Sequence, residues 1–190
     1  MLPTKMIVNN NEIILKEILP KKSFFFNMTE KLRIVFSIFY LAIAVFFIIN
    51  ALNSSFWLFS IIAIGIFCNA LYIAFFRWIL KYWKLKNHYY SITNQRVIIA
   101  EKANGKILKY KALNEIEQVN IEMNAEYFGN IIFGEPEGIS DKHNGSFSFF
   151  LQKRGVNFNE DKYAFFSVEN IDEIIPVLNE LGLKVNKTFY

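Results

Sequence analysis

The residue types that could carry acid–base, metal or thiol chemistry are few and scattered in this chain. His88 and His143 are its two histidines, and Cys68, its one cysteine, lies within an apolar stretch. Two separated histidines and one thiol form no familiar zinc site unless carboxylates complete it. Further acidic residues lie beside Gly, Asn and Lys, as in solvated turns: Glu135, Glu137, Asp141, Glu160 and Asp161. With no phosphate-loop, dinucleotide or zinc-protease motif present, we expect no enzyme, no metal and no cofactor.

A polar tetrapeptide, Thr93-Asn94-Gln95-Arg96, has two interpretations. In the structural one, Thr93 and Asn94 form a turn between two strands and Arg96 pairs with a nearby acid. In the functional one, Arg96 together with Lys109 or Lys111 contacts an anionic headgroup or a phosphopeptide. The structural interpretation is favoured because residues 87–190 hold 11 basic and 14 acidic side chains, a net charge of −3. Arg96, Lys109 and Lys111 remain the candidate ligand contacts.

Two apolar segments dominate the first half of the chain. The stretch from Ile34 to Phe76 contains no Asp, Glu, Lys or Arg, and is interrupted only by a short polar break over residues 51–55. A helix needs about 20 apolar residues to cross a bilayer, and two such segments fit, at about 33–52 and 56–80. Neither has the polar face of a soluble core helix. The pattern predicts a membrane α-helical hairpin over residues 32–80.

Helix packing inside this hairpin is harder to predict. The first segment offers no small-xxx-small motif that would assign a packing face. Asn69 is the one strongly polar side chain well inside either segment. We expect it to form a hydrogen bond between the two helices. A place in a conduction path would need ionisable or clustered polar partners, which the spans lack.

The basic excess lies at the outer ends of the hairpin. Residues 1–33 carry six basic and three acidic side chains, and residues 77–86 add four basic and no acidic ones. The connecting residues 51–55 are uncharged. The positive-inside rule therefore places both termini in the cytoplasm, in a plasma or inner membrane. A nucleic-acid binder would concentrate positive charge in its folded domain, so no nucleic-acid partner is expected.

Aromatic and basic side chains alternate where the second segment ends. Such a mixture is typical of residues at the membrane–water interface. The aromatic triplet at 24–26, beside two lysines, is also expected there. The candidate membrane-surface contacts after the second segment are Arg77, Trp78, Lys81, Tyr82, Trp83, Lys84 and Lys86.

After residue 88 the pattern changes to the period of two that strands show. Strands are predicted over 89–94, 96–101, 107–111, the second half of 113–123, 129–133, 146–151 and 163–168. Asn104-Gly105 predicts a two-residue hairpin turn with both residues at positive φ. The segment 12–19 is too short to distinguish a strand from a helical turn. Loops rather than crossover helices join these runs, which predicts an antiparallel sheet.

A helix is expected to close this domain. Asn170 and Glu173 have the spacing of a capping box, and an apolar stripe runs from Ile171 to Leu181. Gly182 stands where a C-terminal cap belongs. Pro176 either kinks the helix or marks its start.

The order of these motifs resembles the bacterial pleckstrin-homology-like (PH-like) membrane proteins, in many of which a two-span hairpin precedes the domain. The resemblance covers roughly residues 10–182 and rests on the run 90–99, the L-x-x-I-x-x-V segment 113–119, the strand 129–134 and the closing element 166–171. This chain differs in having Val168 where Ile is usual and in a long insertion over 135–145. The resemblance implies a PH-like antiparallel β-roll closed by a C-terminal helix, and hence an α+β, mainly β domain.

The expected organisation has four parts: a cytoplasmic N-terminal segment over 1–31, the hairpin over 32–80, a basic linker over 81–88, and the cytoplasmic PH-like domain over 89–190. We expect a membrane-anchored, non-enzymatic interaction or oligomerisation module. Its partners would be the lipid bilayer and either another protein or further copies of the chain. The alternative is an accessory subunit of a small membrane transporter or channel, with the hairpin as a pore element.

Overall fold

The computed structural model describes residues 11–53, 56–138, 157–158 and 160–190. The chain divides into two compact units. One comprises Met28–Lys81 and Gly138–Asn159 and is called here the helix unit. The other comprises Met1–Asn27, Tyr82–Glu137 and Glu160–Tyr190 and is called the sheet unit.

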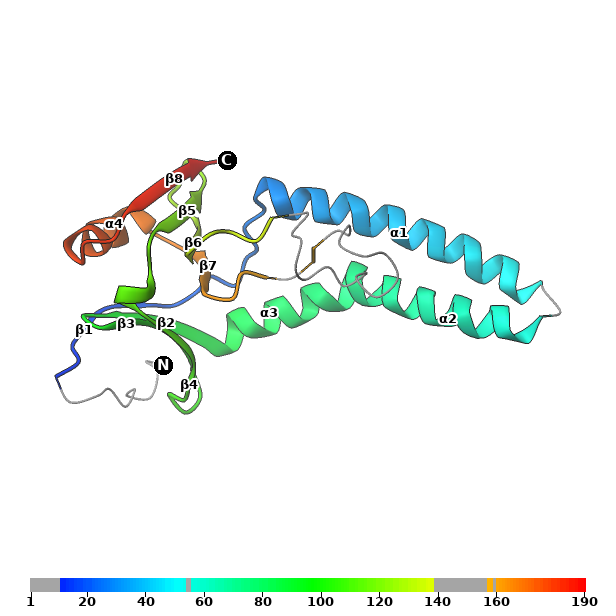
Figure 1. The fold of residues 1–190 in the computed structure, drawn as a ribbon, viewed down its shortest axis with the longest axis horizontal. Coiled ribbons are helices and arrows are strands. Elements are labelled where there is room, and N and C mark those ends of the chain that lie inside the picture. The colour runs from blue at the N-terminus through cyan, green and yellow to red at the C-terminus, as the bar shows by residue number, and fades with distance from the viewer. Residues whose placement is uncertain (1–10, 54–55, 139–156, 159) are drawn as a thin grey trace. The chain divides into compact units, whose positions relative to one another are not determined.

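Two long apolar helices form the helix unit (Figure 1). The first, α1, spans Met28–Leu52; the second runs without a break through α2 (Trp57–Leu71), the π-helical segment η1 (Tyr72–Phe76) and α3 (Arg77–Asn87). The last turns of α3, from Tyr82 on, are counted with the sheet unit. Both helices are long and apolar enough to cross a membrane, judged by length and composition. The second is longer than the sequence predicts, because the residues expected to form a basic linker continue the helix.

Small side chains lie between α1 and α2. Ser37, Ala44 and Ala51 are buried at intervals of seven residues on α1, and Ala63 and Ala70 at the same interval on α2. An interval of seven keeps one face of a helix against its neighbour, as in coiled-coil packing. Small residues therefore do mark the packing faces of the helices, at intervals of seven residues rather than the four of a small-xxx-small motif. A hydrogen bond from Ser60 Oγ to the carbonyl oxygen of Ala51, 3.1 Å long, joins the two helices near their connection.

The sheet unit contains two four-stranded sheets. In the first, β1 (Ile14–Ile18), β2 (His88–Thr93), β3 (Arg96–Glu101) and β4 (Ile107–Ala112) lie in chain order and are antiparallel throughout. The undecided segment before the helices is therefore a strand, β1. The predicted strands 89–94, 96–101 and 107–111 are confirmed, with ends that differ by one residue.

The second sheet has the order β7-β6-β5-β8. Its strands are β5 (Val119–Met123), β6 (Gly129–Phe133), β7 (Ala164–Val168) and β8 (Val185–Phe189). The short 3-10 helix η2 (Leu113–Glu115) precedes β5. The strand predicted over 146–151, and most of the insertion over 135–145, lie outside the described residues.

The expectation of purely antiparallel pairing is wrong for one pair of strands. β8 was not predicted, and it pairs in parallel with β5, with Val119 opposite Val185. A parallel neighbour needs a connection that crosses over the sheet. The helix α4 (Ile171–Glu180), which precedes β8, provides part of that connection. The fold class is α+β.

The helix α4 occupies the predicted position, but its N-terminus differs from the prediction. Asn170 is the N-cap residue, yet it has the left-handed conformation and its side chain caps no backbone N–H, so the capping box is absent. Pro176 lies inside the helix. The C-terminal cap is confirmed: Gly182 has φ +75°, and its N–H donates to the carbonyl of Asn179 while Leu183 N–H donates to that of Leu178.

The Asn-Gly hairpin turn is also corrected. Gly105 has φ +70°, but Asn104 is not at positive φ. Instead, Gly105 N–H donates to the carbonyl of Glu101, and Glu101 N–H donates to that of Lys106. The residues after Glu101 make a helical turn first, so the loop is longer than two residues and only its Gly needs the left-handed region.

One core unites the two sheets and α4. Ile92 and Val97 from the first sheet, Ile121 and Phe165 from the second, and Ile174 from α4 belong to the same buried cluster. The rings of Tyr90 and Phe165 stack across it at 4.5 Å between centroids. Phe25, expected at a membrane interface, is instead buried within this unit against Phe128 and Tyr190.

Candidate functional site

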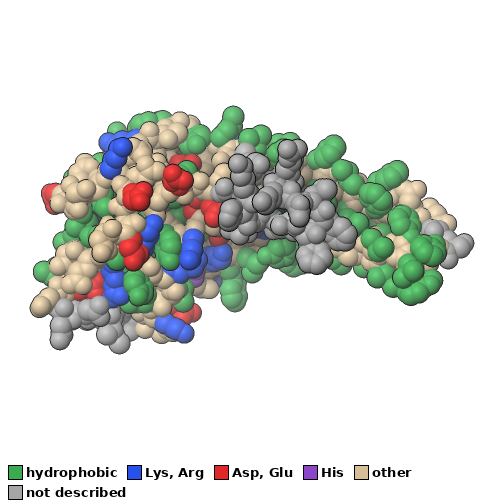
Figure 2. Space-filling model, in the orientation of Figure 1, with side chains coloured by type: hydrophobic (Ala, Val, Ile, Leu, Met, Phe, Trp, Pro, Cys, Tyr) green, Lys and Arg blue, Asp and Glu red, His purple; other side chains and the backbone are tan. Residues whose placement is uncertain are grey.

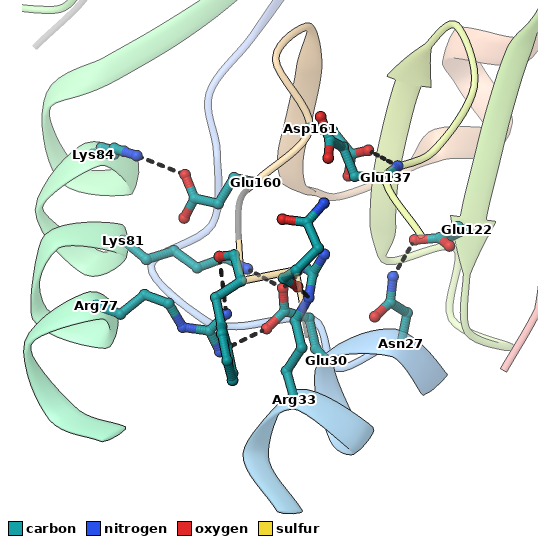
Figure 3. Close-up of polar contacts among 12 residues, drawn as sticks. Asn27, Glu30, Arg33, Arg77, Lys81, Lys84, Glu122, Glu137, Glu160 and Asp161 are labelled. Atoms are coloured by element: carbon teal, nitrogen blue, oxygen red, sulfur yellow. Dashed lines mark hydrogen bonds and ion pairs between the residues drawn. The ribbon is translucent and has the colours of Figure 1, made fainter. Parts of the chain in front are cut away.

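The densest group of charges in the helix unit surrounds one carboxylate, Glu30. Glu30 and Arg33 are three residues apart near the start of α1, and Arg77 and Lys81 are four residues apart in α3. Spacings of three and four put each pair on one face of its helix. Figure 3 shows the four side chains converging from the two helices. We call these four residues the Glu30 cluster.

The cluster is buried and tightly bonded. Glu30 Oε1 lies 2.9 Å from Arg33 Nη1 and 3.6 Å from Lys81 Nζ, and Glu30 Oε2 lies 3.3 Å from Arg77 Nη2. The four side chains expose 3–10% of their area. A carboxylate that holds three cations at low exposure is a strong electrostatic link between two helices, because water screens it little.

Backbone carbonyls and aromatic rings complete the surroundings of the arginines. Arg33 Nε donates to the carbonyl of Asn157 at 2.7 Å, and Arg77 Nη1 donates to that of Phe158 at 3.4 Å. The Arg77 guanidinium also lies 4.7 Å from the ring centre of Trp78, and 5.4 Å from that of Phe158. Such contacts favour a buried cation. These contacts therefore hold the guanidinium groups of both arginines in fixed positions.

The predicted membrane-surface residues fall into two groups. Lys81 is buried in the Glu30 cluster and Arg77 nearly so, with Trp78 half-buried beside them. The other four side chains are exposed on α3: Tyr82, Trp83, Lys84 and Lys86. Of these, Lys84 pairs with Glu160 at 2.6 Å. Glu30 was not predicted as the partner of Arg77 and Lys81; the one signal in the sequence is that it is a single acid among basic residues just before the first apolar segment.

The candidate ligand contacts of the sheet unit do not converge on one point. Arg96 Nε and Nη2 donate to the two carboxylate oxygens of Glu12, both at 2.9 Å. Lys111 Nζ donates to the carbonyl of Phe133 at 3.0 Å, and Lys109 Nζ to that of Lys162 at 3.4 Å. The hydrogen bonds with Glu12 raise the pKa of Arg96 above its ordinary value.

The tetrapeptide itself forms the turn that the structural interpretation expects. Thr93 Oγ1 accepts hydrogen bonds from the N–H groups of Gln95 and Arg96, and donates to Glu12 at 2.8 Å. Asn94 Oδ1 accepts from the N–H of Ile13. The turn is thus tied to the segment that leads into β1, and Arg96 pairs with a nearby acid as that interpretation requires.

The residues considered for acid–base and metal chemistry stay apart. Within the part of the chain that the structure describes, no group of three or more His, Cys, Asp or Glu side chains could hold a metal ion. His88 begins β2, and its pKa is lowered chiefly by burial, with Lys84 adding to the effect. Cys68 is a free, exposed thiol on α2, and His143 lies outside the described residues.

The arrangement is therefore electrostatic and structural in character, with the Glu30 cluster as its centre. Comparison with protein-family models, with curated proteins and with solved structures finds no match to this chain.

Proposed function

We propose that this chain is a non-enzymatic, membrane-anchored module for protein interaction or oligomerisation. Its helix unit would cross the bilayer as a hairpin. Its sheet unit would be a PH-like domain in the cytoplasm, with both termini on that side of a plasma or inner membrane. One observation carries the proposal: on the described helices of the helix unit the buried apolar side chains are alanines, Ile73 apart, whereas many large apolar side chains are exposed.

The exposed residues of the helix unit fit hydrocarbon better than water. Phe39, Phe46 and Trp57 each expose about two thirds of their area, at 67%, 65% and 66%. Figure 2 shows such hydrophobic side chains gathered over the helices on the face drawn. Contiguous apolar surfaces of this kind mark sites that contact membranes or other proteins. Because the surface extends along both helices, a bilayer is the favoured neighbour.

The Glu30 cluster supports a boundary position for its end of the hairpin. Charged groups at the centre of a bilayer are costly, and in membrane proteins they pair or lie toward the ends of spans. Here Arg33 closes one end of the uncharged stretch and Arg77 the other. Glu30 would then hold the start of α1 and the residues around Arg77 together at the cytoplasmic surface. Tyr82, Trp83, Lys84 and Lys86 would then lie near the headgroups of that leaflet.

The sheet unit offers the surfaces for partners. β4 is an outer strand of the first sheet and β8 an outer strand of the second. On β4, Leu108 and Tyr110 are exposed, and on β8, Phe189. An outer strand can accept an extended segment of another chain through main-chain hydrogen bonds. Binding of this kind needs no catalytic group.

Two measurements test the proposal: whether the full chain is integrated into a membrane, and which of its residues face the outside of the cell. The full chain should stay in the membrane fraction after extraction at alkaline pH. In a Cys68→Ala background, an impermeant maleimide added to intact cells should label Ser54→Cys and should leave Asn179→Cys, an exposed residue of α4, unlabelled. Release of the chain by alkaline extraction would contradict the anchoring. Labelling of Asn179→Cys in sealed cells would contradict the orientation.

A further inference from the structure

Asn69 lies on the outer surface of the helix unit. It was expected to join the two helices, but its side chain is exposed, and among the described residues it makes no hydrogen bond. Two other asparagines of the same unit behave differently. Asn50 and Asn53 each donate to the carbonyl oxygen four residues earlier, at 2.7 and 3.1 Å. Asn69 is thus an amide left open toward whatever surrounds α2.

The depth of Asn69 makes this exposure costly in a membrane. It lies eight residues before Arg77, which is about 12 Å along the helix at 1.5 Å per residue. On the proposed placement of the hairpin, that position is deep within a hydrocarbon core about 30 Å thick. An amide there has no water to bond with, so a partner that supplies both a donor and an acceptor lowers its free energy.

The residues around Asn69 form a seam. Leu58, Ile62, Gly65, Asn69 and Tyr72 follow one another at alternating intervals of four and three residues, and all five are exposed. This is the spacing of the a and d positions of a coiled coil. The seam lies on a different face of α2 from Ala63 and Ala70, which are buried. We call these five residues the Asn69 seam.

Gly65 adds an independent sign that a helix approaches this face. A Cβ built on Gly65 would have nothing within 4 Å, so no neighbour among the described residues requires a glycine there. Glycine in the middle of a helix is unfavourable compared with alanine. In membranes, small residues let a second helix backbone come close.

We propose that the Asn69 seam pairs with the same seam of a second copy of the chain, with the two Asn69 amides bonded to each other. An amide carries both a donor and an acceptor, so it is complementary to itself. Two copies inserted with the same topology bring Asn69 to the same depth, as a two-fold interface requires. A single Asn at an a position fixes register and oligomeric state in coiled coils. The inference rests on the proposed membrane anchoring and names the partner that it left open.

Disulfide cross-linking of the full chain tests this pairing. The purified protein, in a Cys68→Ala background, is reconstituted in phosphatidylcholine vesicles and oxidised with copper phenanthroline. Ile62→Cys lies on the seam, and Ile64→Cys is the matched control, off the seam on the same helix and similarly exposed at 51% against 60%. We expect Ile62→Cys to form a product of twice the 22.3 kDa chain mass and Ile64→Cys to stay monomeric.

The amide is tested by Asn69→Leu in the Ile62→Cys protein. The dimer fraction should fall about threefold to tenfold, the scale of side-chain hydrogen bonds between membrane helices. Asn69→Gln, which keeps a donor and an acceptor, should retain most of the dimer. Because Asn69 contacts no other described side chain through hydrogen bonds, neither change should prevent folding.

Each result separates this inference from the function on which it rests. If the chain remains in vesicles after alkaline extraction but Ile62→Cys and Ile64→Cys cross-link equally, or if Asn69→Leu leaves the dimer unchanged, the pairing is overturned and the anchoring stands. The same oxidation is also carried out on native membranes. A cross-linked product there whose mass is not twice that of the chain would overturn the pairing, in favour of a different protein as the partner. If alkaline extraction releases the chain, the anchoring fails first.

Discussion

The two units of this protein bury opposite kinds of side chain. In the sheet unit, the core consists of large side chains that are fully buried, among them Tyr89, Ile98 and Phe165. In the helix unit, the buried apolar positions are mostly alanines, while Phe39 and Phe46 are exposed. In water, burial of large apolar groups drives folding. In hydrocarbon that drive is absent, and helices associate through close packing of small residues and through polar contacts. The contrast is what the proposed function requires, with the sheet unit in water and the helix unit in hydrocarbon.

The largest effect is expected when the same type of substitution, Phe to Ala, is made once in each unit and the two losses of stability are compared. Phe165→Ala should destabilise the sheet unit by about 3–5 kcal/mol, because it empties the centre of a packed core. Phe39→Ala, at a position exposed in the structure, should change stability by less than about 0.5 kcal/mol. Urea unfolding of the full chain in detergent, followed by near-ultraviolet circular dichroism, gives both values. Equal losses would mean that the helix unit also packs its large residues in a core.

The Glu30 cluster tests whether polar contacts hold the helix unit. Glu30→Gln leaves Arg33, Arg77 and Lys81 buried without their shared carboxylate, which should cost about 3–5 kcal/mol. The matched control is Glu173→Gln, which breaks the exposed pair with Lys16 and should cost at most about 1 kcal/mol. Thermal unfolding in detergent compares the two. A loss no greater than that of the control would show that the cluster contributes little to stability.

The alanine face of α2 is a third point of comparison. Ala70→Leu forces a larger side chain between α1 and α2 and should destabilise the helix unit by about 1–3 kcal/mol. Cys68→Leu adds bulk at an exposed position of the same helix and should be nearly neutral. Resistance of the two variants to unfolding in sodium dodecyl sulfate is the measurement. Similar resistance would argue against close packing at Ala70.

The smallest expected effect concerns pH and the sheet unit. Burial lowers the pKa of His88 below about 6.5, the usual value for histidine. The unfolded chain therefore binds more protons than the folded one as the pH falls through that value. Stability contributed by neutral His88 is present above about pH 6.5 and is lost as the pH falls toward the folded pKa. His88→Gln should reduce the drop in melting temperature over this window. An unchanged drop would assign it to other groups.

Features that depend on a short window of sequence were predicted well. The apolar helices were found because helix length and hydropathy can be counted directly along the chain. The first sheet's strands and the glycine cap at Gly182 were found in the same way. Even so, two local predictions were wrong. Asn104 does not take positive φ, because the preceding residues form a helical turn. Asn170 stands at the N-cap but is left-handed, and its side chain makes no capping hydrogen bond.

Features that join distant segments could not be predicted. Glu12 meets Arg96 across 84 positions, and Glu30 meets Arg77 across 47. β1 was undecided and β8 unseen, because each gains its hydrogen bonds only from a strand elsewhere in the chain. The orientation of Asn69 away from α1 likewise depends on which face of α2 receives the alanines.

The sequence by itself thus determined where apolar helix, strand and turn occur, since hydropathy and turn chemistry act over a few neighbouring residues. Only the tertiary structure decided which strand lies beside which, which charge meets which, and which side of α2 is left open. Those choices depend on packing among residues far apart in the chain, where many pairings satisfy the same local pattern and only the assembled core and the buried charges select one.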